Sequence, residues 1–182
     1  MKRSSRSFQI ALSALACAVA AGALTLGSYV HVLFAAGYLI AIFALMVPLS
    51  KNFYWGASLA FLGAALLAFL FCGFAIFELL PFVAFFGLHP IVNRIQLQTV
   101  KRKPFHILWF VLKAAWFDGA LLLIWFTLGE ILGFTSATWY PYVASRLYLF
   151  VFLAGTVAFF IYDVMIFLCQ RSADAIIKRI GR

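Results

Sequence analysis

Five ionisable side chains stand inside long apolar stretches of this sequence: Glu78, Lys113, Asp118, Arg146 and Asp163. A charge within a lipid bilayer is costly, so each of these residues needs a partner or a functional role. Residues at equal depth in an antiparallel helix pair have a constant sum of residue numbers, so Lys113–Asp163 and Asp118–Arg146 cannot both be in register. We therefore expect Lys113 and Asp163 to form a structural ion pair, which leaves Asp118 and Arg146 less completely neutralised.

Several polar groups are expected in the outer third of the membrane together with aromatic side chains. This set comprises His31, Glu78, Asp118, Trp125, Glu130, Tyr142 and Arg146. Convergent polar groups within an apolar, aromatic wall are typical of a site for a small molecule, which here is expected to be a substrate. The alternative interpretation is an aromatic belt at the level of the lipid headgroups, with an ion pair that locks two helices.

Motifs for catalysis, nucleotides or metals do not occur in this sequence. It contains no GxxxxGK[ST], GxGxxG, HExxH or GxSxG, and its three histidines are not spaced as metal ligands. We therefore expect no catalytic residue, no metal and no cofactor. A function that needs energy must then take its ATPase from a partner. If the chain is instead a small intramembrane enzyme, the candidate acid is Glu78 or Asp118.

The composition identifies the environment that must position these side chains. Hydrophobic residues make up 66% of the 182 residues and charged residues 10%, with a mean hydropathy of +1.08. A soluble domain carries roughly a quarter charged residues, so most of this chain must lie in lipid. The net charge of +9 would suggest nucleic acid in a soluble protein. Because twelve of the 14 basic residues lie at chain ends and in loops, we expect membrane lipid and no nucleic acid as a partner.

Six apolar stretches are long enough to cross a bilayer, and they predict an all-α integral membrane protein that forms one six-helix bundle over residues 1–182. These spans are residues 8–26, 29–48, 53–73, 76–94, 105–128 and 142–168. A basic amphipathic tail is expected over 172–182. The N-terminal segment also has features of a cleavable signal peptide, but its apolar run continues past Gly22, which favours a retained span.

The distribution of Lys and Arg predicts the orientation of these spans. Twelve basic residues fall at one set of ends, whereas the opposite loops 27–28, 73–75 and 129–141 contain none. Cytoplasmic loops retain Lys and Arg, so both termini are expected on the cytoplasmic side of the cell membrane.

Small residues recur every fourth position in the first and third spans, and such faces allow helices to approach closely in lipid. The first span has Ala14, Ala18 and Gly22, and the third has Gly56, Ala60, Ala64 and Ala68. These faces either pack within this subunit or dock another membrane protein, for which the first span is the better candidate.

The chain resembles the substrate-binding (S) components of energy-coupling factor transporters. The shared features are its size, six spans with both termini inside, and a first helix with the pattern Ala14, Ala18, Gly22. The segment FFGLHPIV at residues 85–92 is similar to a pattern in uncharacterised members. The resemblance implies capture of a vitamin-like solute from outside. It also implies docking to a transmembrane coupling subunit that two cytoplasmic ATPases serve. The alternative hypothesis is a non-catalytic scaffold, such as a cell-envelope assembly protein.

Overall fold

The computed structural model describes residues 6–73, 76–100, 103–128 and 134–180, and every regular element among them is a helix. The all-α prediction is therefore confirmed for this part of the chain. By length and composition, four of its helical stretches can cross a membrane: Arg6–Tyr29, Tyr54–Phe71, Phe105–Thr127 and Leu147–Arg179. A shorter apolar helix covers Phe34–Leu49. These helices fit a multi-pass membrane protein.

The chain divides into two compact units. Unit 1 contains Met1–Gln98 and Ile166–Arg182, and unit 2 contains Thr99–Met165. The boundary falls within the long helix α9 (Thr156–Ile180), which contributes residues to both units.

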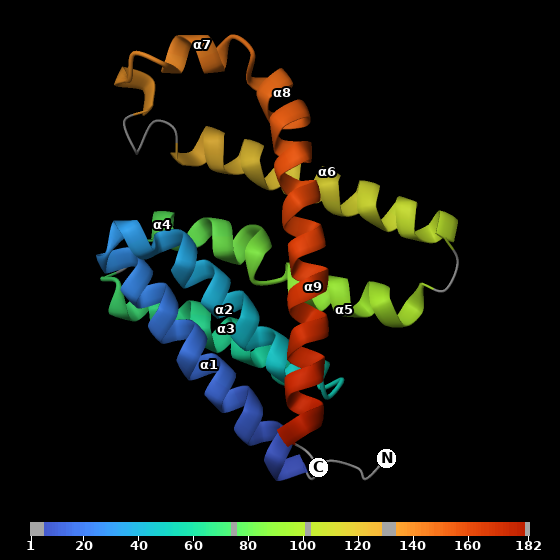
Figure 1. Ribbon diagram of the computed structural model, residues 1–182. Helices are drawn as coiled ribbons and strands as arrows, with labels where there is room; N and C mark the ends of the chain where they lie inside the picture. The colour runs from blue at the N-terminus through green and yellow to red at the C-terminus, as the bar shows by residue number, and fades with distance from the viewer. Residues whose placement is uncertain (1–5, 74–75, 101–102, 129–133, 181–182) are drawn as a thin grey trace. The chain divides into compact units, whose positions relative to one another are not determined.

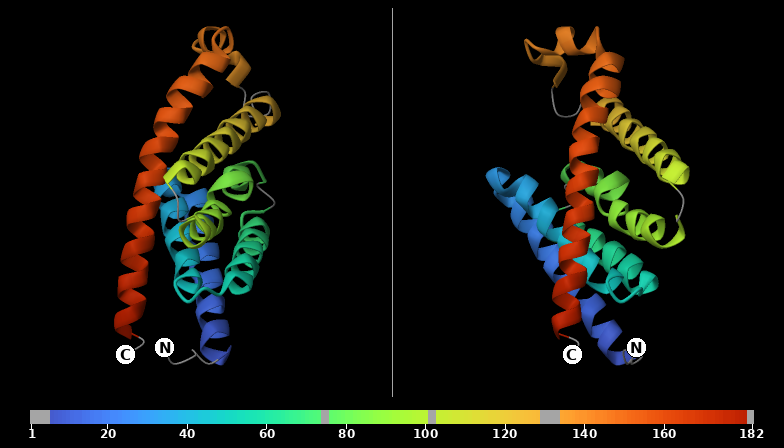
Figure 2. Two further views of the ribbon diagram at one scale, coloured as in Figure 1. Left: turned by 90° about the vertical axis from the view of Figure 1, so that its right-hand side faces the viewer. Right: turned by 45° about the vertical axis from the view of Figure 1, so that its right-hand side comes forward.

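Three helices of unit 1 lie side by side: α1 (Arg6–Tyr29), α2 (Phe34–Leu49) and α3 (Tyr54–Phe71) (Figures 1 and 2). The 3-10 helix η1 (His31–Leu33) joins α1 to α2. Gly37 allows the backbones of α1 and α2 to approach closely, because a Cβ atom on Gly37 would lie 2.6 Å from the carbonyl oxygen of Ala23. The chain turns from α2 into α3 at Asn52, whose φ of 58° lies in the left-handed region that Asn tolerates.

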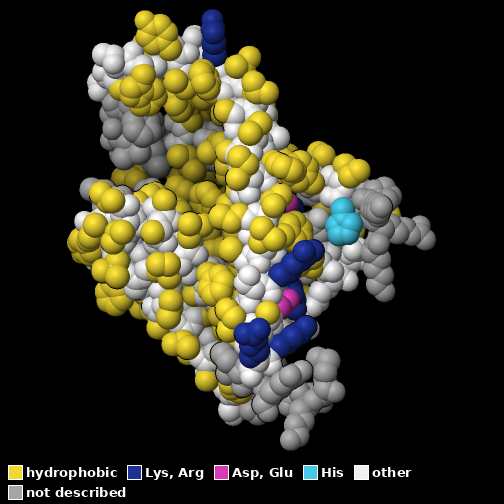
Figure 3. Space-filling model, in the orientation of Figure 1, with side chains coloured by type: hydrophobic (Ala, Val, Ile, Leu, Met, Phe, Trp, Pro, Cys, Tyr) yellow, Lys and Arg dark blue, Asp and Glu magenta, His cyan; other side chains and the backbone are white. Residues whose placement is uncertain are grey.

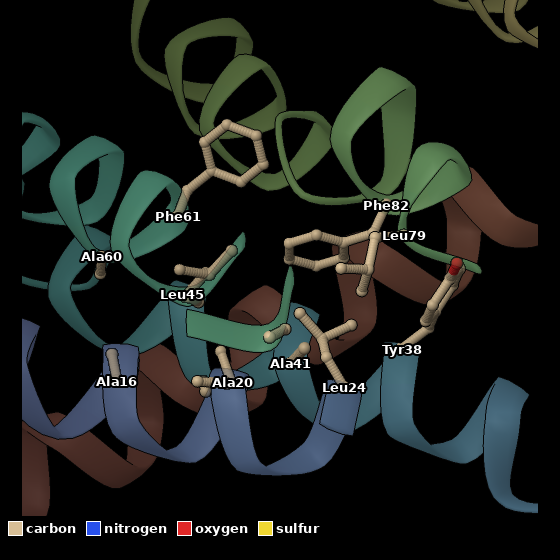
Figure 4. Close-up of a cluster of buried hydrophobic side chains, with 14 residues drawn as sticks. Ala16, Ala20, Leu24, Tyr38, Ala41, Leu45, Ala60, Phe61, Leu79 and Phe82 are labelled. Atoms are coloured by element: carbon tan, nitrogen blue, oxygen red, sulfur yellow. The ribbon is translucent and has the colours of Figure 1, made fainter. Parts of the chain in front are cut away.

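The core of unit 1 is built from small residues and a few large rings (Figure 4). Ala16, Ala20 and Leu24 of α1 face Ala41 and Leu45 of α2. Two aromatic rings, Phe61 and Phe82, close this core with their centroids 5.7 Å apart. The small side chains let the helix backbones come close, so dispersion contacts replace the hydrophobic effect that lipid does not supply.

The predicted fourth span, residues 76–94, is interrupted in the structure. It consists of α4 (Ile76–Pro81), the π-helix η2 (Phe82–Phe86) and, after a turn at Gly87, α5 (His89–Thr99). The amide of Gly87 donates to the carbonyl of Phe82 at 2.8 Å, which closes the wide π turn. Pro90 restricts the backbone just after this turn, so a new helix begins there.

Unit 2 contains α6 (Lys103–Leu128), the 3-10 helix η3 (Phe134–Ser136), α7 (Tyr140–Ala144), α8 (Leu147–Leu149) and the π-helix η4 (Phe150–Gly155), and α9 begins in it. The last predicted span, 142–168, thus spans several elements and extends further than expected. The predicted amphipathic tail is not a separate helix in the described residues, because α9 continues to Ile180.

The face seen in Figure 3 is mainly hydrophobic, and Lys and Arg side chains gather around the C-terminal part of α9.

Candidate functional site

Lys113 and Asp163 are brought together inside unit 2. Lys113 lies on α6 and Asp163 on α9, and the Lys113 Nζ is 2.5 Å from Asp163 Oδ1. Their side chains are only 1% and 8% exposed. Each charge therefore compensates the other where water does not reach them, which is the arrangement that lipid favours.

Asp118 is buried on α6, and Arg146 does not neutralise it. The Thr156 hydroxyl donates to Asp118 Oδ2 at 3.2 Å, while Oδ1 has no hydrogen-bond partner among the described residues. Gly155 of η4 packs against this carboxylate, since a Cβ atom there would lie 3.0 Å from Oδ1. Arg146 lies exposed between α7 and α8 and forms no ion pair with Asp118. Asp118 is consequently a buried acid with one open oxygen.

One of the predicted aromatic residues, Trp125, belongs to a small stack of rings in unit 2. Trp125 and Tyr140 lie parallel, with centroids 5.3 Å apart and an angle of 4° between their planes. Trp139 adds a third ring 6.4 Å from Trp125. Tyr142 is 77% exposed and lies outside this stack. The stack fits a headgroup belt as well as a ligand wall.

The other predicted site residues are not gathered with these. Glu78 belongs to unit 1, where it is half-buried and its backbone carbonyl accepts a hydrogen bond from the Tyr38 hydroxyl. His31 begins η1, also in unit 1, and its side chain is outside the described part of the structure. Glu130 lies outside the described residues altogether. Within either unit, then, the described residues do not assemble the whole predicted site.

A polar network in unit 1 was not predicted, and it joins the turn before α3 to α5 and α9. Arg94 donates to Asp174 Oδ2 at 2.8 Å and to Asn52 Oδ1 at 3.0 Å. The Gln98 amide also donates to Asn52 Oδ1. Tyr54 donates to Gln98 Oε1 at 2.5 Å, and Gln170 donates to Asp174 Oδ1 at 3.2 Å. We call these six residues the Arg94 network.

Three polar side chains on one face of α5 are also buried in unit 1. His89 and Asn93 are fully buried and Gln96 is 3% exposed. Spacings of four and three place these residues on one helix face. The sequence contains a signal for this face, because His89, Asn93 and Gln96 follow at helical spacing at and just beyond the end of the predicted fourth span. The hydropathy pattern predicts instead the end of a span that leads into a basic loop.

The two small-residue faces differ in what covers them. Gly56, Ala60, Ala64 and Ala68 of α3 are all buried. On α1 the buried small residues are Ala16, Ala20, Ala21 and Ala23, among others. The predicted docking residues Ala14, Ala18 and Gly22 lie on the opposite side of α1 and are exposed. A Cβ atom on Gly22 would meet no atom of the described residues within 4 Å. The face of α3 is therefore used within the subunit, whereas that of α1 is open.

No three His, Cys, Asp or Glu side chains in the described ranges lie together as a metal site would require.

No protein-family model, no curated protein and no solved structure matches the chain.

Proposed function

We propose that this chain is a multi-pass protein of the cell membrane with six crossings and both termini in the cytoplasm. The segment from α4 to α5 would make the fourth crossing. The proposal is supported by the twelve basic residues at one set of span ends and their absence from the opposite loops.

Within that membrane, we propose that the chain is the substrate-capture subunit of a multi-subunit importer that takes up a small vitamin-like solute from the outer side. The observation that carries the proposal is the open face of Ala14, Ala18 and Gly22 on α1. Small residues at this spacing let a second backbone approach closely in lipid. The partner would be a transmembrane coupling subunit with cytoplasmic ATPases, because the chain has no nucleotide motif of its own.

Unit 2 supplies the features that support solute capture. Asp118 is 4% exposed and its Oδ1 accepts no hydrogen bond from the described residues. Since a buried polar atom without a partner is costly, a donor group on a solute would stabilise it. The parallel rings of Trp125 and Tyr140 belong to the same unit and offer an apolar surface.

The proposal is tested by calorimetry and by co-purification. The purified protein is titrated with vitamins and related small solutes, and the complex is isolated from its native membranes. We expect one solute class to bind and Asp118→Asn to weaken that binding by about tenfold, the effect of losing about 1.4 kcal/mol. We expect an ATPase-containing complex that Ala18→Leu disrupts.

Ala115→Leu is the matched control, because Ala115 is equally small and exposed but lies on α6. It should leave the complex intact. Ala18→Leu should leave solute binding intact, which separates docking from capture. If no solute binds and no ATPase partner is isolated, the proposal of an importer subunit is overturned.

A second candidate function is a non-catalytic membrane scaffold. It is favoured by the exposure of Arg146 and by the lack of an ion pair between Arg146 and Asp118. On this view the α1 face binds a partner and the buried charges only fix the helices. Asp118→Asn would then lower stability while the partner still bound.

A further inference from the structure

A groove opens on the surface of unit 1 between the first turns of α3 and the middle of α5. It has a volume of about 350 Å³ and is lined by Tyr54, Trp55, Ser58, Ile91 and Ile95. Trp55 is 79% exposed and Ile95 is 39% exposed. The volume lies near the lower end of the range of roughly 300–1,000 Å³ that is usual for small-molecule sites.

The position of Trp55 indicates the level of this groove in a membrane. Trp55 belongs to the first turn of α3, one of the helices long and apolar enough to span a bilayer. A polar turn, Ser50 to Asn52, precedes that helix. Trp and Tyr at the start of a span lie at the boundary between headgroups and acyl chains. The groove therefore opens where an acyl chain meets its headgroup.

A basic residue lies in the turn that leads into the groove-lining start of α3. Lys51 lies three residues before Tyr54 and forms no ion pair with any acidic residue that the structure describes. Arg94, by contrast, is held by Asp174 and Asn52. The Tyr54 hydroxyl is occupied by Gln98. Lys51 is thus a cation close in sequence to the groove that no described acidic residue neutralises.

We infer that the groove binds an anionic phospholipid, with one acyl chain against Trp55, Ile91 and Ile95 and the phosphate beside Lys51. An amphiphile with a negative head matches an apolar groove whose lining residue Tyr54 follows an unneutralised lysine by three positions. The Arg94 network fixes Tyr54 and the preceding turn, so it holds the two ends of the site in place. This inference does not depend on the importer or on the scaffold.

The test uses the intrinsic fluorescence of Trp55. A variant in which Trp109, Trp116, Trp125 and Trp139 are replaced by Phe is reconstituted in phosphatidylcholine vesicles. A brominated lipid, which quenches tryptophan on contact, is added as phosphatidylglycerol or as phosphatidylcholine. We expect half-maximal quenching at an about fivefold lower fraction of brominated phosphatidylglycerol, the preference that one cation near the surface supplies.

Three variants test the parts of the site. Lys51→Ala should bring the two lipids to the same quenching fraction, and Lys51→Arg should keep the preference. Ser58→Phe should fill the groove and reduce quenching by both lipids. A single-Trp125 variant serves as the control and should show no preference linked to Lys51.

Equal quenching of Trp55 by both lipids would overturn the inference, as would quenching by neither. A preference that persists in Lys51→Ala would also overturn it, because the phosphate would then lie elsewhere.

Discussion

Two buried carboxylates of unit 2 have different neighbours, and the difference decides what each can do. Asp163 lies 2.5 Å from Lys113 Nζ. Asp118 receives one hydrogen bond from Thr156, and among the described residues its other oxygen has no partner. The Lys113–Asp163 ion pair is neutralised and stabilises the fold. The Asp118 oxygen that lacks a hydrogen-bond donor would be stabilised by a further donor group.

Removing one member of the Lys113–Asp163 pair should destabilise the protein strongly. Lys113→Met or Asp163→Leu alone leaves an uncompensated buried charge, and we expect a loss of about 3–5 kcal/mol in the free energy of unfolding. The double variant removes both charges and should recover most of that loss. Reversible unfolding in mixed detergent micelles measures all three. Single variants as stable as the native chain would contradict a compensated pair.

At this scale the sequence was informative about one pair and not about the other. Lys113 and Asp163 could be proposed as a pair because they carry opposite charges within long apolar stretches, and both lie in regular helix, on α6 and α9. Arg146 could not be placed in this way. It lies between α7 and α8, where the helix is interrupted, so its depth does not follow from a constant rise per residue.

Among the elements, α1 has two small-residue faces with opposite environments. One face packs so closely on α2 that Gly37 has no room for a side chain. The other, with Gly22, is open. Matched substitutions at these two glycines therefore separate packing within the subunit from docking to a partner.

We expect Gly37→Ala to destabilise the isolated protein and Gly22→Ala not to do so. The new methyl of Gly37→Ala would overlap the Ala23 carbonyl, with a cost of about 1–3 kcal/mol. Gly22→Ala meets no neighbour and should add up to about 1 kcal/mol through helix propensity. Thermal unfolding of the two variants in the same detergent makes the comparison. Equal effects would show that α1 and α2 do not cross as closely as described.

The turn between α2 and α3 should respond to backbone and side-chain changes separately. Asn52→Gly removes the acceptor for Arg94 and Gln98 but keeps the left-handed backbone, at a cost of about 1 kcal/mol. Asn52→Ala also removes the acceptor and, in addition, strains the left-handed backbone, so it should lower the free energy of unfolding by roughly 1–2 kcal/mol more. The difference in unfolding free energy between these two variants is the measurement. If Ala and Gly behave alike, the positive φ is not a determinant of this turn.

The predicted elements agree with the structure where the apolar pattern is uninterrupted, as in α1 and α3. The pattern did not predict the break between α4 and α5. Hydropathy remains high through Phe85 and Phe86, and only Gly87 and Pro90 signal the turn. The Arg94 network was also missed, because its residues are far apart in the sequence and only the folded turn and helices bring them together.

For the whole molecule, the proposed topology can be tested with single cysteines in a Cys-free background. Thr138 lies in an opposite-side loop and Gln98 near the basic residues. A membrane-impermeant maleimide should label Thr138→Cys in intact cells, and Gln98→Cys only after permeabilisation. Labelling of both positions in intact cells would contradict six crossings with cytoplasmic termini. The experiment matters because four long apolar helices alone allow other topologies.

The open face of α1 has a consequence for the cell that makes this protein. Lipid tails contact a row of Ala and Gly poorly, and a second copy of the chain carries the same row. Chains made in large amounts would therefore tend to pair with each other through Ala14, Ala18 and Gly22. If the proposed coupling subunit docks on this face, balanced synthesis of the two proteins would suppress such homodimers, and the ratio of their expression would influence assembly.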